Sequence, residues 1–269
     1  MNLVTIEATT IEDAWFQCIY KILDEGSVFK IDRGSYAGSK RLEFDYITIR
    51  LKAPGVRPLI PQIPSHYSIP NPVADDYLDD YLPYLMTGAL KEGESYTYGQ
   101  RICGSKLPED ISSNYKEDSM KDIVVQENEI WNTSKIIEMN PQGEMFLNQM
   151  ELLIWTYKNK GHRNNQMVLQ VAQPTDILLQ DPCCLRQIDT RIQDGKLHFF
   201  PTFRSWDLWG GFPANLAAIQ MMKEYVAGEI GVGDGEIIAN SKGLHIYDYA
   251  FDLGKLLALK DDMKLKEGK

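Results

Sequence analysis

Two adjacent cysteines, an arginine and a histidine occur in an order that could support nucleophilic chemistry. Cys183 and Cys184 come first, Arg204 follows them, and His245 lies farther along the chain. A deprotonated thiol is the reactive form of cysteine, and a nearby guanidinium stabilises it by lowering the thiol pKa. The same composition is compatible with buried, unreactive cysteines, because free cysteine is among the residue types most often found inside proteins.

The elements around the cysteines leave both interpretations open, but they place the thiol and the arginine together. Residues 185–192 and 196–204 alternate between apolar and polar types and flank the dipeptide Asp194-Gly195. Asp-Gly between two such segments is typical of a type I′ hairpin turn. Because the arms of a hairpin run antiparallel, we expect Cys184 and Arg204 at the same end of a sheet, where the cation would favour the thiolate.

Polar side chains with hydrogen-bonding capacity follow the hairpin. Pro213 suits the first turn of a long apolar helix, since its missing N–H costs nothing there. Asn215 offers a donor and an acceptor near the start of this helix, which suits either the edge of a pyrimidine ring or helix capping. His245 and Tyr247 alternate in a strand-like segment and share one face. They could hold a ligand hydroxyl, or bond to neighbouring protein groups.

The rest of the chain supplies the scaffold. Thr10 and Asp13 form a capping-box-like pair at the start of a helix. Four acidic residues from Asp75 to Asp80 are spaced like metal ligands, but a solvated helix face is the simpler interpretation. The expected elements are a helix over 10–25, β structure over 27–52, an irregular loop over 53–72 with six prolines, a helix over 74–85, a polar surface excursion with one short helix over 106–141, a helix over 143–158 and a strand over 167–172.

Composition limits the classes of function. The chain has 269 residues, of which 43% are hydrophobic, and can form one large domain or two small ones. A net charge of −10 disfavours an extended nucleic-acid surface. The spacing of the four cysteines fits neither a disulfide framework nor a zinc site, which predicts free thiols in the cytoplasm. No signal pattern or apolar run long enough to span a membrane is visible.

Five motifs in fixed order resemble the thymidylate synthase superfamily. They are Pro-Cys at 182–184, Asp-Gly-Lys-Leu at 194–197, Arg-Ser-x-Asp at 204–207, Gly-Phe-Pro-x-Asn at 211–215 and His-x-Tyr at 245–247. The resemblance covers residues 98–100 and 166–249. Within the superfamily, the sequence is most similar to the archaeal-type synthases and the pyrimidine-nucleotide hydroxymethylases. Its spacing assigns the family nucleophile to Cys184 and not to Cys183.

The resemblance implies a fold and an assembly. We expect residues 1–269 to form a single thymidylate synthase-like catalytic domain of the α/β (α+β) class, in which a large twisted mixed sheet packs against helices. The family forms a homodimer by packing sheet against sheet, and each subunit supplies phosphate-binding arginines to its partner.

The resemblance also implies a reaction. Cys184 would attack C6 of a deoxypyrimidine monophosphate, with dUMP favoured because Asn215 suits uracil better than cytosine. C5 would then accept a one-carbon unit from 5,10-methylene-tetrahydrofolate or methylene-tetrahydromethanopterin, with no metal, giving dTMP. The resemblance implies that Arg204 and Ser205 bind the phosphate, together with Arg33 from a mobile loop. Asn215 would recognise the base, and His245 and Tyr247 would bind the ribose. Tyr98 would take part in proton removal from C5, and Asp207 and Gly211 would contact the pterin.

Departures from the family pattern leave three competing interpretations. The paired arginines of the family fall at Gln166 and Met167, so Arg163 is the candidate to act across the dimer. The usual active-site glutamate cannot be placed, and the tryptophan that shields the methylene carbon has no counterpart. Addition of water to the same intermediate would make a dUMP or dCMP hydroxymethylase. The chain could also be a catalytically silent nucleotide-binding protein, or a cysteine hydrolase that uses Cys184 with His245.

Overall fold

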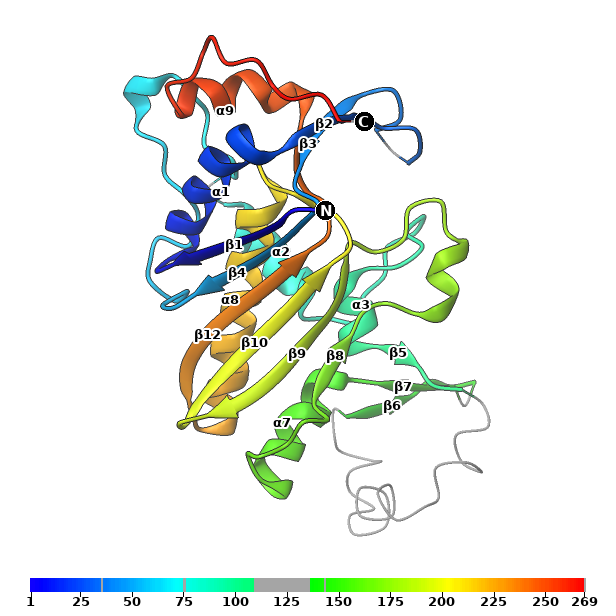
Figure 1. The fold of residues 1–269 in the computed structure, drawn as a ribbon. Helices are drawn as coiled ribbons and strands as arrows, with labels where there is room; N and C mark the ends of the chain where they lie inside the picture. Colours follow the sequence, from blue (N-terminus) through cyan, green and yellow to red (C-terminus); the bar gives the residue numbers. More distant parts are fainter. Residues whose placement is uncertain (35, 75, 109–135, 143, 269) are drawn as a thin grey trace.

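The largest layer of the molecule is a six-stranded mixed sheet (Figure 1). The computed structural model describes residues 1–34, 36–74, 76–108, 136–142 and 144–268. β1 pairs parallel with β4, β10 pairs parallel with β12, and the other neighbours are antiparallel. In spatial order the strands are β1 (Leu3–Ala8), β4 (Tyr46–Leu51), β12 (Gly233–Ser241), β10 (Lys196–Phe203), β9 (Leu185–Gln193) and β8 (Val168–Gln170).

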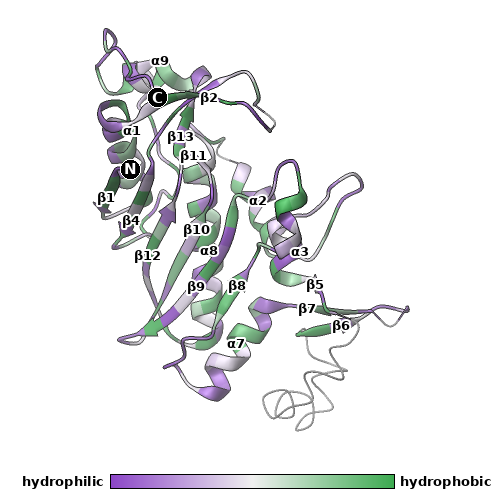
Figure 2. Ribbon diagram, turned by 45° about the vertical axis from the view of Figure 1, so that its right-hand side comes forward, coloured by the Kyte–Doolittle hydropathy of each residue, from purple (hydrophilic) through white to green (hydrophobic). Residues whose placement is uncertain are grey.

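Helices cover one face of this sheet. The central one is α8 (Gly211–Ile230), with α1 (Ile11–Glu25) and α7 (Gln149–Lys160) on either side of it (Figure 1). Buried residues alternate with half-buried ones along β4, β10 and β12, so one side of each strand packs on the helices. Figure 2 shows this alternation as changes between hydrophobic and hydrophilic colours along the strands. No described α-helix lies on the other face (Figure 1).

A smaller sheet adjoins the large one, and the chain passes twice from a strand of the large sheet directly into a strand of the smaller sheet. Its order is β11 (Trp206–Asp207), β13 (Leu244–Tyr247), β3 (Lys40–Glu43) and β2 (Ser27–Lys30). β10 leads into β11 through Arg204 and Ser205, and β12 leads into β13 through Lys242 and Gly243. The backbone bond from Trp206 N to Gly243 O, 3.2 Å, holds the two crossings together.

The remaining elements lie beside the large sheet. A third sheet contains β5 (Ser105–Lys106), β7 (Met145–Leu147) and β6 (Ile137–Met139). The short helices α2 (Tyr77–Leu85) and α3 (Tyr98–Cys103) pack closely, since a Cβ on Gly99 would lie 2.2 Å from the carbonyl oxygen of Tyr84. The others are α9 (Phe251–Leu257) and the 3₁₀ turns η1 (Ser65–Tyr67), η2 (Pro174–Leu178) and η3 (Asp248–Ala250).

Most predicted elements are confirmed. The Thr10 side chain accepts from Asp13 N at 3.1 Å at the start of α1, and Asp194 and Gly195 have the positive φ values, 52° and 70°, that a type I′ turn requires. The helix predicted over 143–158 begins too early. Asn148 caps it, and Met145 with Phe146 belongs to β7 instead. The short helix expected within 106–141 falls mostly outside the described residues.

Candidate active site

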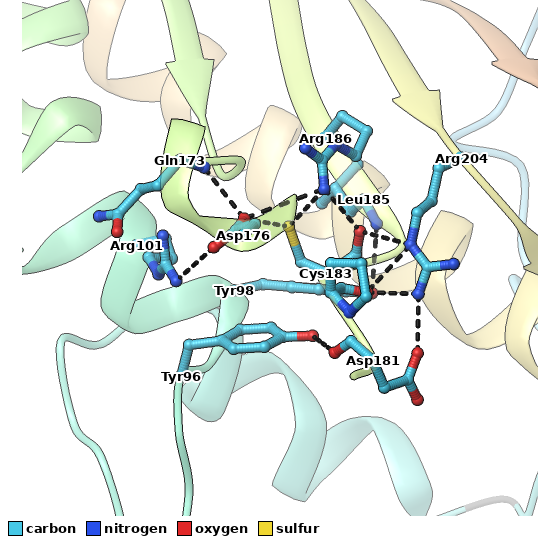
Figure 3. Close-up of polar contacts among 11 residues, drawn as sticks. Tyr96, Tyr98, Arg101, Gln173, Asp176, Asp181, Cys183, Leu185, Arg186 and Arg204 are labelled. Carbon is cyan, nitrogen blue, oxygen red and sulfur yellow. Dashed lines mark hydrogen bonds and ion pairs between the residues drawn. The ribbon is translucent and has the colours of Figure 1, made fainter. Parts of the chain in front are cut away.

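Cys183 belongs to a buried polar network (Figure 3). Its thiol donates to Asp176 Oδ2 at 3.2 Å, and Asp176 Oδ1 accepts from Arg101 at 2.9 Å. Arg186 Nη1 lies 3.4 Å from the same sulfur. Burial and the hydrogen bond to Asp176 raise the pKa of Cys183 to about 11. Cys183 is therefore a protonated structural thiol at neutral pH.

Cys184 has a different environment. It lies immediately before β9, is half-buried, and its thiol makes no hydrogen bond to any described residue. Burial raises the pKa of Cys184, and the positive charge of Arg204 lowers it by less. The predicted effect of Arg204 is confirmed in direction, since its charge lowers the pKa of Cys184. Loss of hydration outweighs this attraction, so the net shift of the pKa is upward.

Arg204 supports the chain segment that carries both cysteines. Its Nε lies 3.0 Å from the carbonyl oxygen of Pro182 and 3.2 Å from that of Cys183. Its Nη2 bonds to the same Pro182 oxygen and to Asp181 Oδ1 at 2.8 Å. The Asp181 charge counteracts part of the effect of Arg204, since it raises the pKa of Cys184.

A cavity of about 670 Å³ opens beside this arginine. It is lined by the two segments that connect the sheets, Arg204-Ser205 and Lys242-Gly243. The basic side chains of Arg41 and Lys242 face it with Arg204, opposed by fewer acidic groups. A cavity with this charge balance suits a phosphate dianion. Its full lining is Met1, Arg41, Glu43, Asp45, Arg204, Ser205, Lys242 and Gly243.

Tyr98 approaches the cysteine from α3. Its hydroxyl accepts a hydrogen bond from the backbone amide of Leu185, the residue after Cys184, at 3.3 Å. Burial raises the pKa of Tyr98, and a negative charge on Cys184 raises it further, so the two groups are close. Tyr98 is a neutral phenol at physiological pH and keeps its own proton for donation.

Asn215 is held by two side chains. Its Oδ1 accepts from Trp206 Nε1 at 3.0 Å, and its Nδ2 donates to the hydroxyl of Tyr81 at 2.7 Å. Neither partner is a free backbone amide, so Asn215 does not cap the helix, and its predicted recognition of the base stays a prediction. The amide nonetheless keeps one N–H and one acceptor position unused among the described residues.

His245 has a buried nitrogen without a partner. Its Nδ1 lies 2.9 Å from the carbonyl oxygen of Gly243, which can only accept, so Nδ1 carries the hydrogen. Burial lowers the pKa of His245, so the ring is neutral and Nε2 is an acceptor. This Nε2 has no hydrogen-bond partner among the described residues, although the side chain is only 1% exposed. A ligand hydroxyl could satisfy it.

Comparison with known proteins assigns this arrangement to a family. The family model described as "Thymidylate synthase" matches residues 112–264. The chain belongs to the thymidylate synthase family. "Putative thymidylate synthase" of Methanosarcina acetivorans is 26% identical over 250 residues, covering 92% of this chain and 91% of the relative. The protein of the same name from Methanosarcina barkeri is 27% identical over 248 residues, with the same coverage of both chains.

Membership of the thymidylate synthase family implies a pyrimidine nucleotide substrate and a folate-type cofactor. The described fold, with mixed sheets and helices, is consistent with that family. All four cysteines are free thiols. In the part of the chain that the structure describes, no helix is long and apolar enough to cross a bilayer.

The residues predicted to contact the cofactor fit a pterin. Asp207 Oδ2 accepts from the amides of Gly210 and Gly211 at 3.1 and 2.9 Å, and Oδ1 accepts from Trp209 N at 3.1 Å. A carboxylate oxygen can take a second bond, so Oδ1 can still accept from a pterin N–H. A Cβ on Gly211 would lie 3.3 Å from Asp207 Cβ and 3.9 Å from Asn215 Oδ1, so glycine keeps open the space between these side chains.

Arg33 and Arg163, the two arginines predicted to reach the phosphate from loops, lie in different parts of the structure. Arg33 is exposed in the loop between β2 and β3, and this loop folds onto the site because Tyr36 stacks on the ring of Tyr247 with centroids 4.1 Å apart. Arg163 is exposed in the loop between α7 and β8, near the opposite end of the large sheet (Figure 1). Asn165 in that loop bonds to Arg191, at the far end of β9 from Cys184. Within one chain, Arg163 is therefore remote from Arg204.

Two residues of the site were missed by the sequence analysis. Tyr81 and Trp206 bond to Asn215. Tyr81 belongs to no recognised motif, and Trp206 occupies the variable position of Arg-Ser-x-Asp. The acids of the same helix, considered for the glutamate position, are exposed where the structure describes them, at Asp76, Asp79 and Asp80; Asp75 lies outside the described residues. The helical spacing that exposes Asp80 turns Tyr81 toward α8, and that spacing is the signal that could have found it.

Proposed function

We propose that this chain transfers a one-carbon unit from a methylene-tetrahydropterin to C5 of dUMP, giving dTMP through a covalent adduct between Cys184 and C6. The observation that carries the proposal is the environment of the Cys184 thiol. It has no hydrogen-bond partner among the described residues, it lies near a guanidinium, and its charge affects the pKa values of Tyr98 and Tyr247. A free thiol at the meeting point of these groups suits a nucleophile.

The chain's own residues can perform the steps on the nucleotide. The Cys184 thiolate forms a bond to C6, and the C5–C6 π electrons move toward C5 and O4, which makes C5 nucleophilic. The bound pterin supplies the methylene carbon and the hydride that reduces it. The C5 proton passes to a water molecule beside the Tyr98 hydroxyl, the electrons of the C5–H bond re-form the C5–C6 double bond, and the thiolate leaves. Because burial raises the pKa of Cys184, the thiolate leaves readily only where Arg204 stabilises the departing charge.

Nucleotide binding divides among three parts of the site. We assign the phosphate to the basic cavity at Arg204 and Ser205, with Arg33 approaching from its loop. The 3′-hydroxyl of the ribose donates to the unpartnered Nε2 of His245, and Tyr247 lies beside it with ring centroids 4.5 Å apart. Asn215 reads the base. Asp207 and Gly211 border the space for the pterin.

We further propose that residues 1–269 form one catalytic domain and that two copies associate through the large sheet. Strands that continue from one sheet into the other support a single domain. The face of the large sheet opposite α8 carries no described α-helix. A cavity of about 510 Å³ on this face is lined in part by Thr202 and Asn240 of the sheet and by Ile177 of η2. Arg163 would reach a phosphate only from a second copy.

The experiment is intact-mass analysis after incubation with 5-fluoro-dUMP and 5,10-methylene-tetrahydrofolate, repeated with methylene-tetrahydromethanopterin. The wild-type protein should gain the mass of nucleotide plus cofactor. Cys184→Ala should abolish this adduct, whereas the matched variant Cys183→Ser, which keeps a donor to Asp176, should retain it. An adduct that survives Cys184→Ala would exclude the proposed nucleophile. Product analysis with dUMP then distinguishes dTMP from the 5-hydroxymethyl nucleotide, and the latter would overturn methylation.

A further inference from the structure

We propose that Trp206 fixes the amide of Asn215 in one orientation and that Tyr81 adds a hydrogen-bond donor beside it. Together they make the site select a base that carries a 4-oxo group, uracil, over one that carries a 4-amino group, cytosine. This inference rests on the proposed function and assigns specificity to Tyr81, which lies outside the family motifs, and to Trp206, which occupies the variable position of Arg-Ser-x-Asp.

The indole of Trp206 fixes the direction of the amide. An indole N–H can only donate, so the atom of Asn215 that lies 3.0 Å from Trp206 Nε1 must be the oxygen. A flipped amide would place two donors against each other and leave the buried indole N–H unpaired. An unpaired buried donor costs on the order of 1–3 kcal/mol. Hydrogen bonding therefore decides the orientation of the amide.

The indole itself cannot turn away. Trp206 is 2% exposed. Its ring stacks on Phe203 with centroids 3.9 Å apart and planes 5° apart, and it packs against Phe212 at 4.6 Å. Phe203 ends β10 and Phe212 belongs to α8, so two principal elements of the fold hold the indole that orients Asn215.

Tyr81 adds a second donor on the other side of the amide. Its oxygen accepts from Asn215 Nδ2 at 2.7 Å. Burial raises the pKa of Tyr81, so the phenol keeps its proton. Nδ2 cannot accept that proton, and no acceptor for it occurs among the described residues. The site therefore presents the Tyr81 O–H and the second N–H of Asn215 beside each other, with Asn215 Oδ1 as the neighbouring acceptor.

This pattern fits one pyrimidine edge. O4 of uracil has two lone pairs and can accept from both donors, while N3–H donates to Oδ1. The 4-amino group of cytosine accepts from neither donor, and its N3 has a single lone pair and no hydrogen for Oδ1. With the amide unable to flip, cytosine would leave donors facing donors, which is how a site built for one hydrogen-bonding pattern rejects an analogue.

The test compares the dissociation constants of dUMP and dCMP, measured by calorimetry without cofactor, in the wild type, Trp206→Phe and Tyr81→Phe. Phenylalanine keeps an aromatic ring at position 206 but removes the N–H. The wild type should prefer dUMP, so its dissociation constant for dCMP should exceed that for dUMP. In each variant the ratio of the dCMP constant to the dUMP constant should fall by about tenfold or more. The control is Trp15→Phe, which also removes a buried indole N–H, bonded here to the carbonyl oxygens of Leu208 and Trp209, and should leave the ratio unchanged.

The outcomes separate the inference from the proposed function. A wild type that binds neither nucleotide defeats the proposed function and the inference with it. A wild type that binds dUMP while both variants keep its selectivity defeats the inference alone. So does a wild type that prefers dCMP, or a Trp15→Phe variant that loses selectivity equally. If Trp206→Phe fails to fold, as judged by circular dichroism, Tyr81→Phe decides the matter.

Discussion

The backbone amide of Arg204 donates to the carbonyl oxygen of Cys184 at 2.8 Å. This bond joins the residue that precedes β9 to the residue that follows β10, so the hairpin closes at the end opposite its turn. The cation and the thiol are therefore neighbours because of the backbone, whatever their side chains do. Their electrostatic coupling is the first property that can be tested.

Removal of the Arg204 charge should raise the pKa of Cys184. The guanidinium is the largest of the effects that lower this pKa, so Arg204→Gln leaves burial less opposed. The rate of Cys184 alkylation by iodoacetamide, followed by peptide mass spectrometry against pH, should shift to higher pH. Arg204→Lys keeps a positive charge and should shift less. An unchanged pH profile in Arg204→Gln would contradict the coupling.

Replacement of His245 should abolish recognition of the ribose hydroxyl. The neutral ring offers Nε2 as an acceptor, so dUMP should bind the wild type more tightly than 2′,3′-dideoxyuridine monophosphate, by roughly 3- to 10-fold for one hydrogen bond. His245→Phe should bind both nucleotides with similar affinity. Calorimetric titration of the four combinations measures the difference. A His245→Phe protein that still prefers dUMP would place the hydroxyl elsewhere.

Substitution of Gly99 should loosen the helices that carry the site tyrosines. An alanine Cβ at this position would lie 2.2 Å from Tyr84 O and 2.6 Å from Thr87 O, both backbone atoms that cannot move alone. Gly99→Ala should lower the free energy of unfolding by about 1–3 kcal/mol. Gly228→Ala is the matched control: no atom lies within 4 Å of its Cβ, and alanine within a helix should add about 0.5–1 kcal/mol. Urea unfolding compares the two, and equal effects would contradict the predicted contact.

Lys223 should make stability depend on pH. This fully buried lysine bonds to Gly235 O and lies 3.2 Å from Asp234 Oδ1, yet burial lowers its pKa to about 8. Between that value and the unfolded pKa near 10.5, the unfolded chain binds the extra proton, so the contribution of Lys223 to stability rises with pH. The gain from pH 7 to pH 10 should reach up to about 3 kcal/mol.

The Lys223→Met variant isolates this contribution. Other groups titrate over the same interval, but they do so in both proteins, so the difference in pH dependence belongs to Lys223. Urea unfolding at the two pH values should give a smaller rise, or a larger fall, in stability for the variant than for the wild type. Parallel pH dependences would show that Lys223 keeps an ordinary pKa when folded.

Local patterns predicted much of the fold. The Asp194-Gly195 turn, the helix that begins near Pro213 and the shared face of His245 and Tyr247 each depend on residues close together in sequence. The two-residue strand β5 and the three-residue strands β6 and β7 are too short to show periodicity, which is why Met145 and Phe146 were assigned to a helix.

Non-local properties of the site could not be predicted in the same way. Tyr81 meets Asn215 across 134 residues of sequence, and their contact depends on how α2 packs against α8. The direction of the Cys184 pKa shift depends on burial, which no spacing of charged residues reveals. The choice of Cys184 over Cys183 came from motif spacing and stays a prediction; the hydrogen bonding that distinguishes the two thiols depends on Asp176 and Arg186 and could not be read from that spacing.

The paired crossings between the two sheets set a length. Arg204-Ser205 and Lys242-Gly243 line one cavity, and the strands that follow each of them carry Asp207 and His245, which are direct partners in the β11–β13 register. In the proposed site, the distance from the phosphate at Arg204 to the ribose at His245 is therefore fixed by these two-residue crossings. Core substitutions that lower the free energy of unfolding should therefore leave the length of the accepted nucleotide unchanged. Insertion of one residue in either crossing should change that length.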